Sequence, residues 1–301
     1  MDYSQAVDTY YAARPAGTAE PEVVVNAGPA RRLRDACEPI AMHAVWSPGT
    51  NAALAAEGLD ALTSYVGGRA ASMGSPVADV VCATFAWLEP GLVCALYDAA
   101  LASVARQRLI DVRDEATTAS LREVLDGADP TEIANLVADA VEPAEGMGRP
   151  LFSGLRALGR PADPVRRLWW ACDLVREHRG DSHIAAAAAA DIGPVQMNIL
   201  TELWVGMPLF SYTATRGWSP EVMQGAVDRL SARGWVRDGA LTDAGRAVRR
   251  EIEARTDAQE QSVVDALGTR LDQVCVQLNT WSSQCIQAGA FPADILKRAA
   301  G

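Results

Sequence analysis

Apolar residues recur at helical spacing along most of the chain. From Ala30 onward, the string ARRLRDACEPIAMHAVW places Leu33, Cys37 and Ile40 three or four residues apart, which is the period of one helix face. Pro39 should bend or restart this helix, because proline cannot donate the backbone hydrogen bond of a helix interior. Gly, Pro and Asp residues separate the other predicted helices, which span about residues 50–66, 76–87, 90–106, 111–126, 130–141, 149–158 and 163–178.

Strand patterns are nearly absent from these stretches. A segment such as VADVVCATFAWL is apolar enough for a buried strand, but its length and alanine content favour a buried helix. Residues 1–29 hold several prolines and glycines and show little periodicity, so we expect a partly ordered arm there. The pattern therefore predicts an all-α protein with a multi-helix domain over residues 30–192.

Residues 193–256 have the element order of a winged helix-turn-helix module. The pattern predicts a helix over residues 195–205 and a short one near residues 209–216. The G-W-S-P turn then opens a third helix, because Ser219 is a good N-cap and Pro220 suits the first helical position. This is the order of helices in a helix-turn-helix.

The third helix and the segment after it complete the predicted module. Gly234 should end this helix. The core stripe of the helix comprises Val222, Ala226, Val227 and Leu230. The sequence Arg237-Asp238-Gly239 should close a very short hairpin, the one β element that we expect, and Thr242 should cap a further helix.

Residues 257–301 continue with helical spacing. Their apolar stripe comprises Val263, Leu267, Leu271, Val274 and Leu278. Terminal helices of this kind commonly mediate two-fold association, so we expect a homodimer. The alternative is that the stripe packs on the N-terminal helices of the same chain.

Composition adds few constraints. The 301 residues are 49% hydrophobic, which suffices for two ordinary domains. No signal peptide pattern and no apolar run of about 18 residues occurs, so we expect a cytoplasmic protein that is not inserted in a membrane. The cysteines form no C-x-x-C pair and are expected to be reduced core residues. They are Cys37, Cys82, Cys94, Cys172, Cys275 and Cys285.

Fingerprints of cofactor binding are missing from the sequence. It contains no G-x-G-x-x-G after a strand, no phosphate-binding G-x-x-x-x-G-K and no zinc-binding H-E-x-x-H. We therefore expect no cofactor. An enzyme of this kind would rely on acid–base chemistry, as in cyclisation, isomerisation, elimination or hydrolysis.

Two resemblances refine this picture. The string LSARGWVRDGALTDAGRAVRREIEAR resembles the recognition-helix end, wing and following helix of MarR-type regulators. Nearly the whole chain is similar to the actinobacterial SalK-like helix-turn-helix proteins, often encoded beside natural-product genes. This similarity rests on EPIAMHAVW (38–46), SYVGGRAASMG (64–74), VADVVCATFAWLEP (77–90), REHRGDSHIAA (176–186), ATRGWS (214–219) and ALTDAGRAVRREIEARTD (240–257). It implies a helix-turn-helix domain and leaves the activity open.

The charge pattern disfavours DNA recognition. The net charge is −11, whereas affinity for duplex DNA comes largely from basic residues. At the start of the predicted recognition helix only Ser219 and Gln224 suit base contacts, and Glu221 would repel phosphates. The other candidate contacts are Arg229, in the same helix, and Arg237, in the wing. Six arginines of the module could contact the DNA backbone, or they could lie on solvated helix faces beside acidic residues. They are Arg216, Arg229, Arg233, Arg246, Arg249 and Arg250.

All three histidines lie in strings that carry the family resemblance, His43 in EPIAMHAVW and His178 and His183 in REHRGDSH. A histidine oriented by Glu177 or Asp181 could act as a general acid or base. Arg176 and Arg179 could hold an anion beside them. Gly180 should break the helix, so that side chains from two helix ends point inward. We therefore expect one cavity between the helical domain and the winged helix. The residues around it would be His43, His178, His183, Arg179 and Asp181.

Two other interpretations of REHRGDSH remain open. In the structural one, a helix ends at His178-Arg179, Gly180 closes it and Asp181 caps the next helix. In the other, His178 and His183 converge with His43 on a metal or haem. Nothing in the sequence fixes such a geometry.

The aromatic residues suggest where a ligand could bind. Core packing is the default role of tryptophans in helices. Several aromatic residues near Arg69 could instead line a cavity for a bulky apolar metabolite, namely Tyr65, Trp46, Trp87 and Trp218.

We therefore expect a small-molecule-binding protein of a specialised metabolic pathway, either a handler of a pathway intermediate or a cofactor-free acid–base enzyme. The alternative is a MarR-like, ligand-responsive transcriptional regulator. A structural dimer or partner-binding protein is a third class.

Overall fold

The computed structural model describes residues 22–300, so most of the predicted N-terminal arm lies outside the described residues. The helical part before the winged helix consists of α2 (Glu22–Val25), α3 (Pro29–Ala41), α4 (His43–Trp46), α5 (Pro48–Ala56), α6 (Ala61–Ala70), η1 (Ala71–Met73), α7 (Ala78–Thr84), α8 (Pro90–Ser103), α9 (Arg106–Val124), α10 (Thr131–Val141), α11 (Pro150–Ala157) and α12 (Pro164–Ala189). The chain is all-α apart from one short hairpin, as the sequence predicts.

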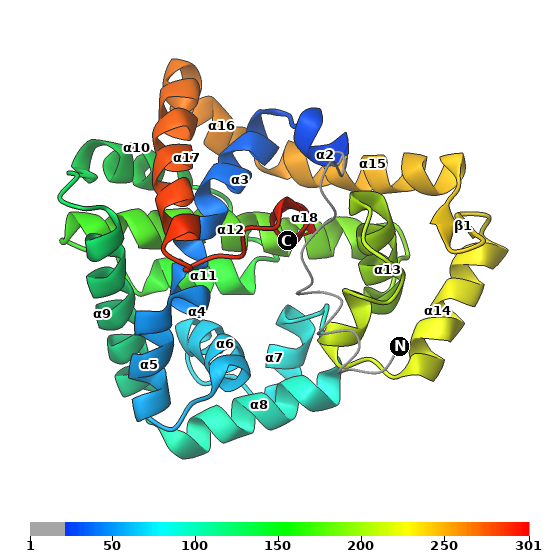
Figure 1. The fold of residues 1–301 in the computed structure, drawn as a ribbon, viewed down its shortest axis with the longest axis horizontal. Coiled ribbons are helices and arrows are strands. Elements are labelled where there is room, and N and C mark those ends of the chain that lie inside the picture. Colours follow the sequence, from blue (N-terminus) through cyan, green and yellow to red (C-terminus); the bar gives the residue numbers. More distant parts are fainter. Residues whose placement is uncertain (1–21, 301) are drawn as a thin grey trace.

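The remaining elements form the winged helix and the C-terminal helices. They are α13 (Pro194–Val205), η2 (Thr213–Arg216), α14 (Pro220–Ala232), β1 (Val236–Arg237), β2 (Ala240–Leu241), α15 (Asp243–Gln259), α16 (Gln261–Leu267), η3 (Gly268–Arg270), α17 (Leu271–Gln287) and α18 (Ile295–Ala300). Figure 1 shows α12 crossing the middle of the molecule, with α13, α14 and the hairpin at one side and α5 and α9 at the other.

The long helix α12 corrects a prediction from the sequence. It continues through Gly180 to Ala189, whereas the sequence suggested a break at the glycine. Gly180 keeps a helical backbone, because the helix packs on α3, α10, α11 and α15. Such tertiary packing outweighs a propensity cost of about 1 kcal/mol. Asp181 caps a different helix from the one expected, since its Oδ2 accepts hydrogen bonds from the backbone N–H groups of Leu151 and Phe152 in α11.

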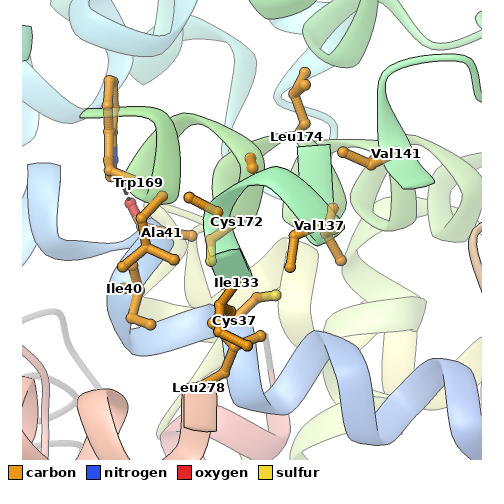
Figure 2. Close-up of a cluster of buried hydrophobic side chains, with 14 of the residues drawn as sticks. Cys37, Ile40, Ala41, Ile133, Val137, Val141, Trp169, Cys172, Leu174 and Leu278 are labelled. Atoms are coloured by element: carbon orange, nitrogen blue, oxygen red, sulfur yellow. Dashed lines mark hydrogen bonds between the residues drawn. The ribbon is translucent and has the colours of Figure 1, made fainter. Parts of the chain in front are cut away.

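The main core lies where α3, α10, α12 and α17 meet. Figure 2 shows Cys37 and Ile40 of α3 facing Ile133 of α10, Cys172 of α12 and Leu278 of α17. The indole Nε1 of Trp169 donates to the carbonyl of Ala41, 3.0 Å away, which satisfies a buried donor.

The C-terminal apolar stripe belongs to this same core. Val263, Leu267, Leu271, Val274 and Leu278 are all buried, and their helices pack against α3 and α10. The interpretation that the stripe packs within its own chain is therefore confirmed. A dimer interface would have to use other residues, and the expected homodimer stays a prediction.

The cysteines divide into two groups. Four are buried, as expected, and they are Cys37, Cys172, Cys275 and Cys285. The expectation of a core location is wrong for Cys82 of α7 and Cys94 of α8, which are only partly buried and whose Sγ atoms lie 2.9 Å apart. Their helices are neighbours in the structure, although the sequence offers no C-x-x-C signal.

The winged helix forms largely as the sequence predicts. Ser219 Oγ caps α14 by accepting from Val222 N, and Pro220 occupies the first turn. Met223 takes the buried place expected for Val222, whose side chain is 42% exposed. In the hairpin, Val236 pairs with Leu241 and Arg237 with Ala240.

Positive backbone φ angles close the hairpin turn. Asp238 has φ 50° and Gly239 has φ 72°, the combination required by a two-residue type I′ turn. Thr242 Oγ1 accepts from Gly245 N at 3.1 Å and caps α15. A Cβ at Gly245 would lie 2.1 Å from the carbonyl oxygen of Trp235, so only glycine permits this close packing of wing and helix.

A buried carboxylate that the sequence did not reveal orders the helix-turn-helix. Glu202 of α13 is fully buried. It accepts hydrogen bonds from the backbone N–H groups of Phe210, Tyr212 and Thr213, and from the Thr213 hydroxyl. The carboxylate thereby fixes the segment that connects α13 to α14.

Between residues 22 and 300, none of the helices combines the length and the apolar character needed to cross a bilayer.

Candidate functional site

A partly open cavity of about 530 Å³ lies between the helical part and the winged helix. Its walls come from α3, α6, the α7–α8 connection, α12, α13, η2, α15 and the C-terminal segment. Aromatic side chains form much of the lining, and they are Trp46, Tyr65, Phe85, Trp87, Tyr212 and Phe291. The volume lies in the range of about 300 to 1,000 Å³ that is typical of small-molecule sites.

One face of α12 supplies the polar side chains of the cavity floor. Around Gly180 these are Arg176, Glu177, Arg179, Asp181 and His183. An α-helix turns about 100° per residue, so these residues lie within about 100° of Gly180 on either side. The continuous helix therefore presents the charged groups to one cavity without the break that the sequence suggested.

Arg69 of α6 links the helical part to α12. Its Nε and Nη2 atoms bind both carboxylate oxygens of Glu177 at 2.7 Å, and its Nη1 donates to the Tyr65 hydroxyl at 2.7 Å. Arg176 Nη1 also donates to Glu177, at 3.0 Å. Burial would raise the pKa of Glu177, but the charges of Arg69 and Arg176 outweigh it and lower the pKa.

A second cluster surrounds Glu253 of α15. This carboxylate accepts hydrogen bonds from Arg31, Arg179 and Arg249. Although burial opposes it, these arginines hold the pKa of Glu253 well below its usual value. Burial lowers the pKa of Arg249 to about 10 despite its bond to Glu253. Within residues 22–300, the Nε atoms of Arg179 and Arg249 have no hydrogen-bond partner.

Among the carboxylates that line the cavity, Asp181 is the one whose protonation changes near neutral pH. Burial, with a contribution from the charge of Glu177, raises its pKa to about 7. Its Oδ2 is held by Leu151 N at 3.1 Å and Phe152 N at 3.2 Å. A carboxyl group with a pKa close to the working pH has the property required of a general acid or base.

His183 faces the cavity as a neutral imidazole. Burial and the nearby charge of Arg249 lower its pKa well below 6.5. Its Nδ1 lies 3.1 Å from Thr256 Oγ1, and its ring packs 5.6 Å from the Trp87 ring between centroids. His183 is therefore suited to hydrogen bonding with a ligand, and it does not carry charge at neutral pH.

The prediction that all three histidines share one cavity is wrong for His178 and His43. His178 points about 160° away from Gly180 and contacts Glu260 through Nδ1 at 2.7 Å. His43 is fully buried, with Nε2 3.0 Å from Ser120 Oγ, and burial lowers its pKa to about 4. Neither residue lines the cavity, so the candidate acid–base groups there are Glu177, Asp181 and His183.

Most of the predicted ligand-binding residues do line the cavity. They are Tyr65, Arg69, Trp46, Trp87, Arg176 and Arg179. Trp218 does not, but its indole donates to the Trp87 carbonyl at 3.0 Å, which Asn198 Nδ2 also binds at 2.8 Å. The α7–α8 connection is therefore fastened to the winged helix behind the cavity wall.

The sequence did not identify several of the residues that line the cavity. Arg31, Arg249 and Glu253 meet only because α3 and α15 are neighbours, although more than 200 positions separate Arg31 from Glu253. Arg249 is 3% exposed, so its assignment to a solvated or DNA-contacting face is wrong. The spacing of Arg249 and Glu253, four residues apart in an otherwise polar helix, was the available signal.

The recognition helix α14 presents few groups for DNA. Ser219, Gln224, Arg229 and Arg237 are all exposed. However, Ser219 caps the helix, and Gln224 donates to Asp228 at 2.9 Å. Glu221 adds a further exposed carboxylate at the helix start.

A metal site would need several ligands close together. Among residues 22–300, no group of three or more His, Cys, Asp or Glu side chains is arranged to hold a metal ion. The described histidines therefore do not form the convergent set that the metal or haem interpretation required.

Comparison with known proteins agrees with the winged-helix geometry. No curated protein and no solved structure matches the chain significantly. A family model described as a helix-turn-helix family matches residues 30–292, which span both the helical part around the cavity and the winged helix. Because this match covers most of its length, the chain belongs to that helix-turn-helix family.

Proposed function

We propose that the protein binds a small, largely apolar molecule in the cavity between α12 and the winged helix. The observation that carries the proposal is the aromatic cavity of about 530 Å³, whose floor holds fixed and mutually paired charges. Buried polar groups in an apolar enclosure give a ligand orientation and specificity. The resemblance to SalK-like proteins suggests an intermediate or product of a natural-product pathway as the ligand.

Gly180 provides a direct test of cavity binding. It lines the cavity, and a Cβ placed there would meet no atom within 4 Å. Gly180→Phe should therefore fill the cavity from a helix that tolerates the side chain. The matched control is Gly180→Ala, which adds one methyl group and should stabilise the helix by about 0.5 to 1 kcal/mol.

The probe is N-phenyl-1-naphthylamine, a neutral dye whose fluorescence rises in apolar sites. We expect saturable one-to-one binding to the wild type and to Gly180→Ala, and at least a tenfold loss of affinity in Gly180→Phe. Circular dichroism should show the same helicity in all three proteins. Equal binding by wild type and Gly180→Phe would exclude the cavity as the site.

Acid–base catalysis on the bound molecule would depend on Asp181. It is the lining carboxylate whose pKa burial raises to about 7. Asp181→Asn keeps an acceptor for Leu151 N and Phe152 N but cannot transfer a proton. Turnover of a pathway intermediate should therefore disappear in this variant while the dye still binds.

A second candidate function is ligand-responsive DNA binding. It is favoured by the contribution of Tyr212, Thr215 and Arg216 to the cavity wall, since η2 precedes the recognition helix. The exposed Glu221 and the Gln224–Asp228 bond on α14 weigh against tight readout.

Fluorescence anisotropy with the duplex upstream of the protein's own gene tests this second function. At physiological salt we expect only weak binding, with a dissociation constant of about 1 μM or higher. A sequence-specific nanomolar complex that N-phenyl-1-naphthylamine dissociates would instead favour the regulator.

A further inference from the structure

Thr256 of α15 fixes the position of the proton on the His183 ring. Its Oγ1 donates its one hydrogen to the carbonyl of Ile252 at 2.8 Å, as threonines that bind back to their own helix do. The same Oγ1 lies 3.1 Å from His183 Nδ1, so it can only accept there. Nδ1 therefore carries the proton of the neutral ring, and Nε2 keeps a lone pair.

This lone pair on Nε2 has no partner among the described residues. The contact with Thr256 is the one side-chain hydrogen bond that His183 makes within residues 22–300, and it uses Nδ1. Nε2 is not fully covered by protein atoms, so a molecule in the cavity can reach it. A ligand that displaces water from the cavity must supply a donor to this atom or leave it unpaired at a cost in free energy.

Asn198 of α13 presents a second acceptor near Trp87. Its Nδ2 donates to the Trp87 carbonyl at 2.8 Å, and this bond fixes the orientation of the amide because a carbonyl can only accept. Its Oδ1 makes no hydrogen bond within residues 22–300, although Asn198 lines the cavity. The His183 ring itself packs 5.6 Å from the Trp87 ring between centroids. Both polar side chains beside Trp87 therefore offer acceptors to the cavity.

The environment of Nε2 favours a neutral donor. Burial is the main cause that lowers the pKa of His183, and it would equally penalise a cation bound beside the ring. Three arginines lower this pKa further, although they bind Glu253, whose charge has the opposite effect. They are Arg249, Arg179 and Arg31. An uncharged hydroxyl avoids both penalties.

We propose that the cavity recognises a neutral, ring-bearing molecule through a hydroxyl group, such as a phenol, that donates its hydrogen to His183 Nε2. This inference rests on the proposed binding function and names the class of its ligand. His183 is the specificity-determining residue. Thr256 is a positioning residue, because it fixes the tautomer of the ring.

Nitrogen-15 NMR of the wild type tests the tautomer directly. Contacts with the Trp87 ring protons assign the His183 signals in a sample labelled at histidine. We expect Nδ1 to resonate as a protonated nitrogen and Nε2 as an unprotonated one. Addition of 2-naphthol should move the Nε2 signal toward the protonated position. A protonated Nε2 in the free protein would overturn the proposal, and this result does not depend on whether any variant folds.

Two naphthalenes test the preference for a donor. 2-Naphthol keeps its hydroxyl hydrogen at pH 7, as a phenol does, and 2-methoxynaphthalene has the same rings and oxygen without that hydrogen. The donor preference is the Kd of 2-methoxynaphthalene divided by the Kd of 2-naphthol, both measured by isothermal titration calorimetry. His183→Phe keeps a ring but removes the acceptor, so the donor preference should fall about tenfold, as expected for a hydroxyl left unpaired in an enclosed site.

Thr256 variants test the positioning role. Thr256→Val keeps the shape of the side chain but removes the acceptor for Nδ1. The donor preference should therefore fall toward that of His183→Phe, and the His183 signals should show a mixture of tautomers. Thr256→Ser retains the hydroxyl and should restore both results. The matched control is Thr118→Val, which removes a similar bond to the Asp114 carbonyl outside the cavity and should change neither.

The possible failures can be told apart. If both naphthalenes bind the wild type and His183→Phe changes their affinities by the same factor, the hydroxyl proposal is overturned while cavity binding stands. If neither naphthalene nor N-phenyl-1-naphthylamine binds the wild type, or if Gly180→Phe binds them as well as the wild type does, the proposed function itself fails.

Discussion

Arg69 and Glu177 form a two-point ion pair in which both nitrogen–oxygen distances are 2.7 Å. The pair joins α6 to α12 and orients the Tyr65 phenol. Both side chains are largely buried, with 16% and 5% exposure. The contact therefore connects the stability of the fold to the shape of the cavity.

Replacing one partner of this pair should be costly. Glu177→Gln leaves Arg69 and Arg176 without their shared carboxylate, so we expect the free energy of unfolding to fall by about 3 kcal/mol. Urea denaturation measures the change. The control is Glu57→Gln, which breaks a solvent-screened pair with the exposed Arg108 and should cost much less free energy of unfolding. Equal losses in the two variants would contradict the structural role of Glu177.

Asp181 should make stability depend on pH. Burial and Glu177 raise its folded-state pKa to about 7, while Arg69 and the N–H groups of α11 act against this rise. Between about pH 4 and 7 the folded protein retains a proton that the unfolded chain releases, so stability is lost as the pH rises through this window. Asp181→Asn removes the effect.

The stability advantage of Asp181→Asn over the wild type should therefore grow from pH 4 to about pH 7 and stay constant above pH 8. Thermal denaturation over this range measures it. Asp173 and Glu202, whose pKa values burial also raises to about 7, titrate in both proteins and cancel in the difference. A constant difference between the two proteins would show that Asp181 titrates normally.

Glu202 should control the order of the helix-turn-helix. Glu202→Gln replaces one accepting oxygen with an NH₂ group that faces backbone donors, so we expect a loss of about 2 kcal/mol. Hydrogen exchange should accelerate first at Phe210, Tyr212 and Thr213, whose N–H groups bind this carboxylate. Glu221→Gln, an exposed change in the same module, should leave the free energy of unfolding nearly unchanged.

Cys82 and Cys94 should form a disulfide under mild oxidation. Their Sγ atoms are 2.9 Å apart, and both side chains are accessible in part. Burial and the neighbouring thiol raise the pKa of Cys82 to about 12, so oxidation by glutathione disulfide should be faster at pH 9 than at pH 7. Mass spectrometry would detect the loss of two hydrogen atoms, which Cys82→Ser should prevent. Persistence of both free thiols would contradict the prediction.

Local sequence determined the helices, their caps and the hairpin turn. Ser219 and Pro220 start α14, Asp238-Gly239 closes the wing and Thr242 caps α15, as predicted. These features depend on residues a few positions apart, through side chains that bind nearby N–H groups and through backbone angles that particular residues adopt easily. Such information is present in any short window of the chain.

Tertiary structure alone decided the cavity. Gly180 stays helical because α12 packs against several other helices, and that continuity places His178 on the side opposite Gly180, outside the cavity. The burial of Glu253 depends on Arg31 of α3 and Arg179 of α12 as partners. A charged residue can line a cavity only when segments distant in the sequence enclose it and supply oppositely charged partners. These partners offset the free-energy cost of burying the charge, and the local sequence does not contain them.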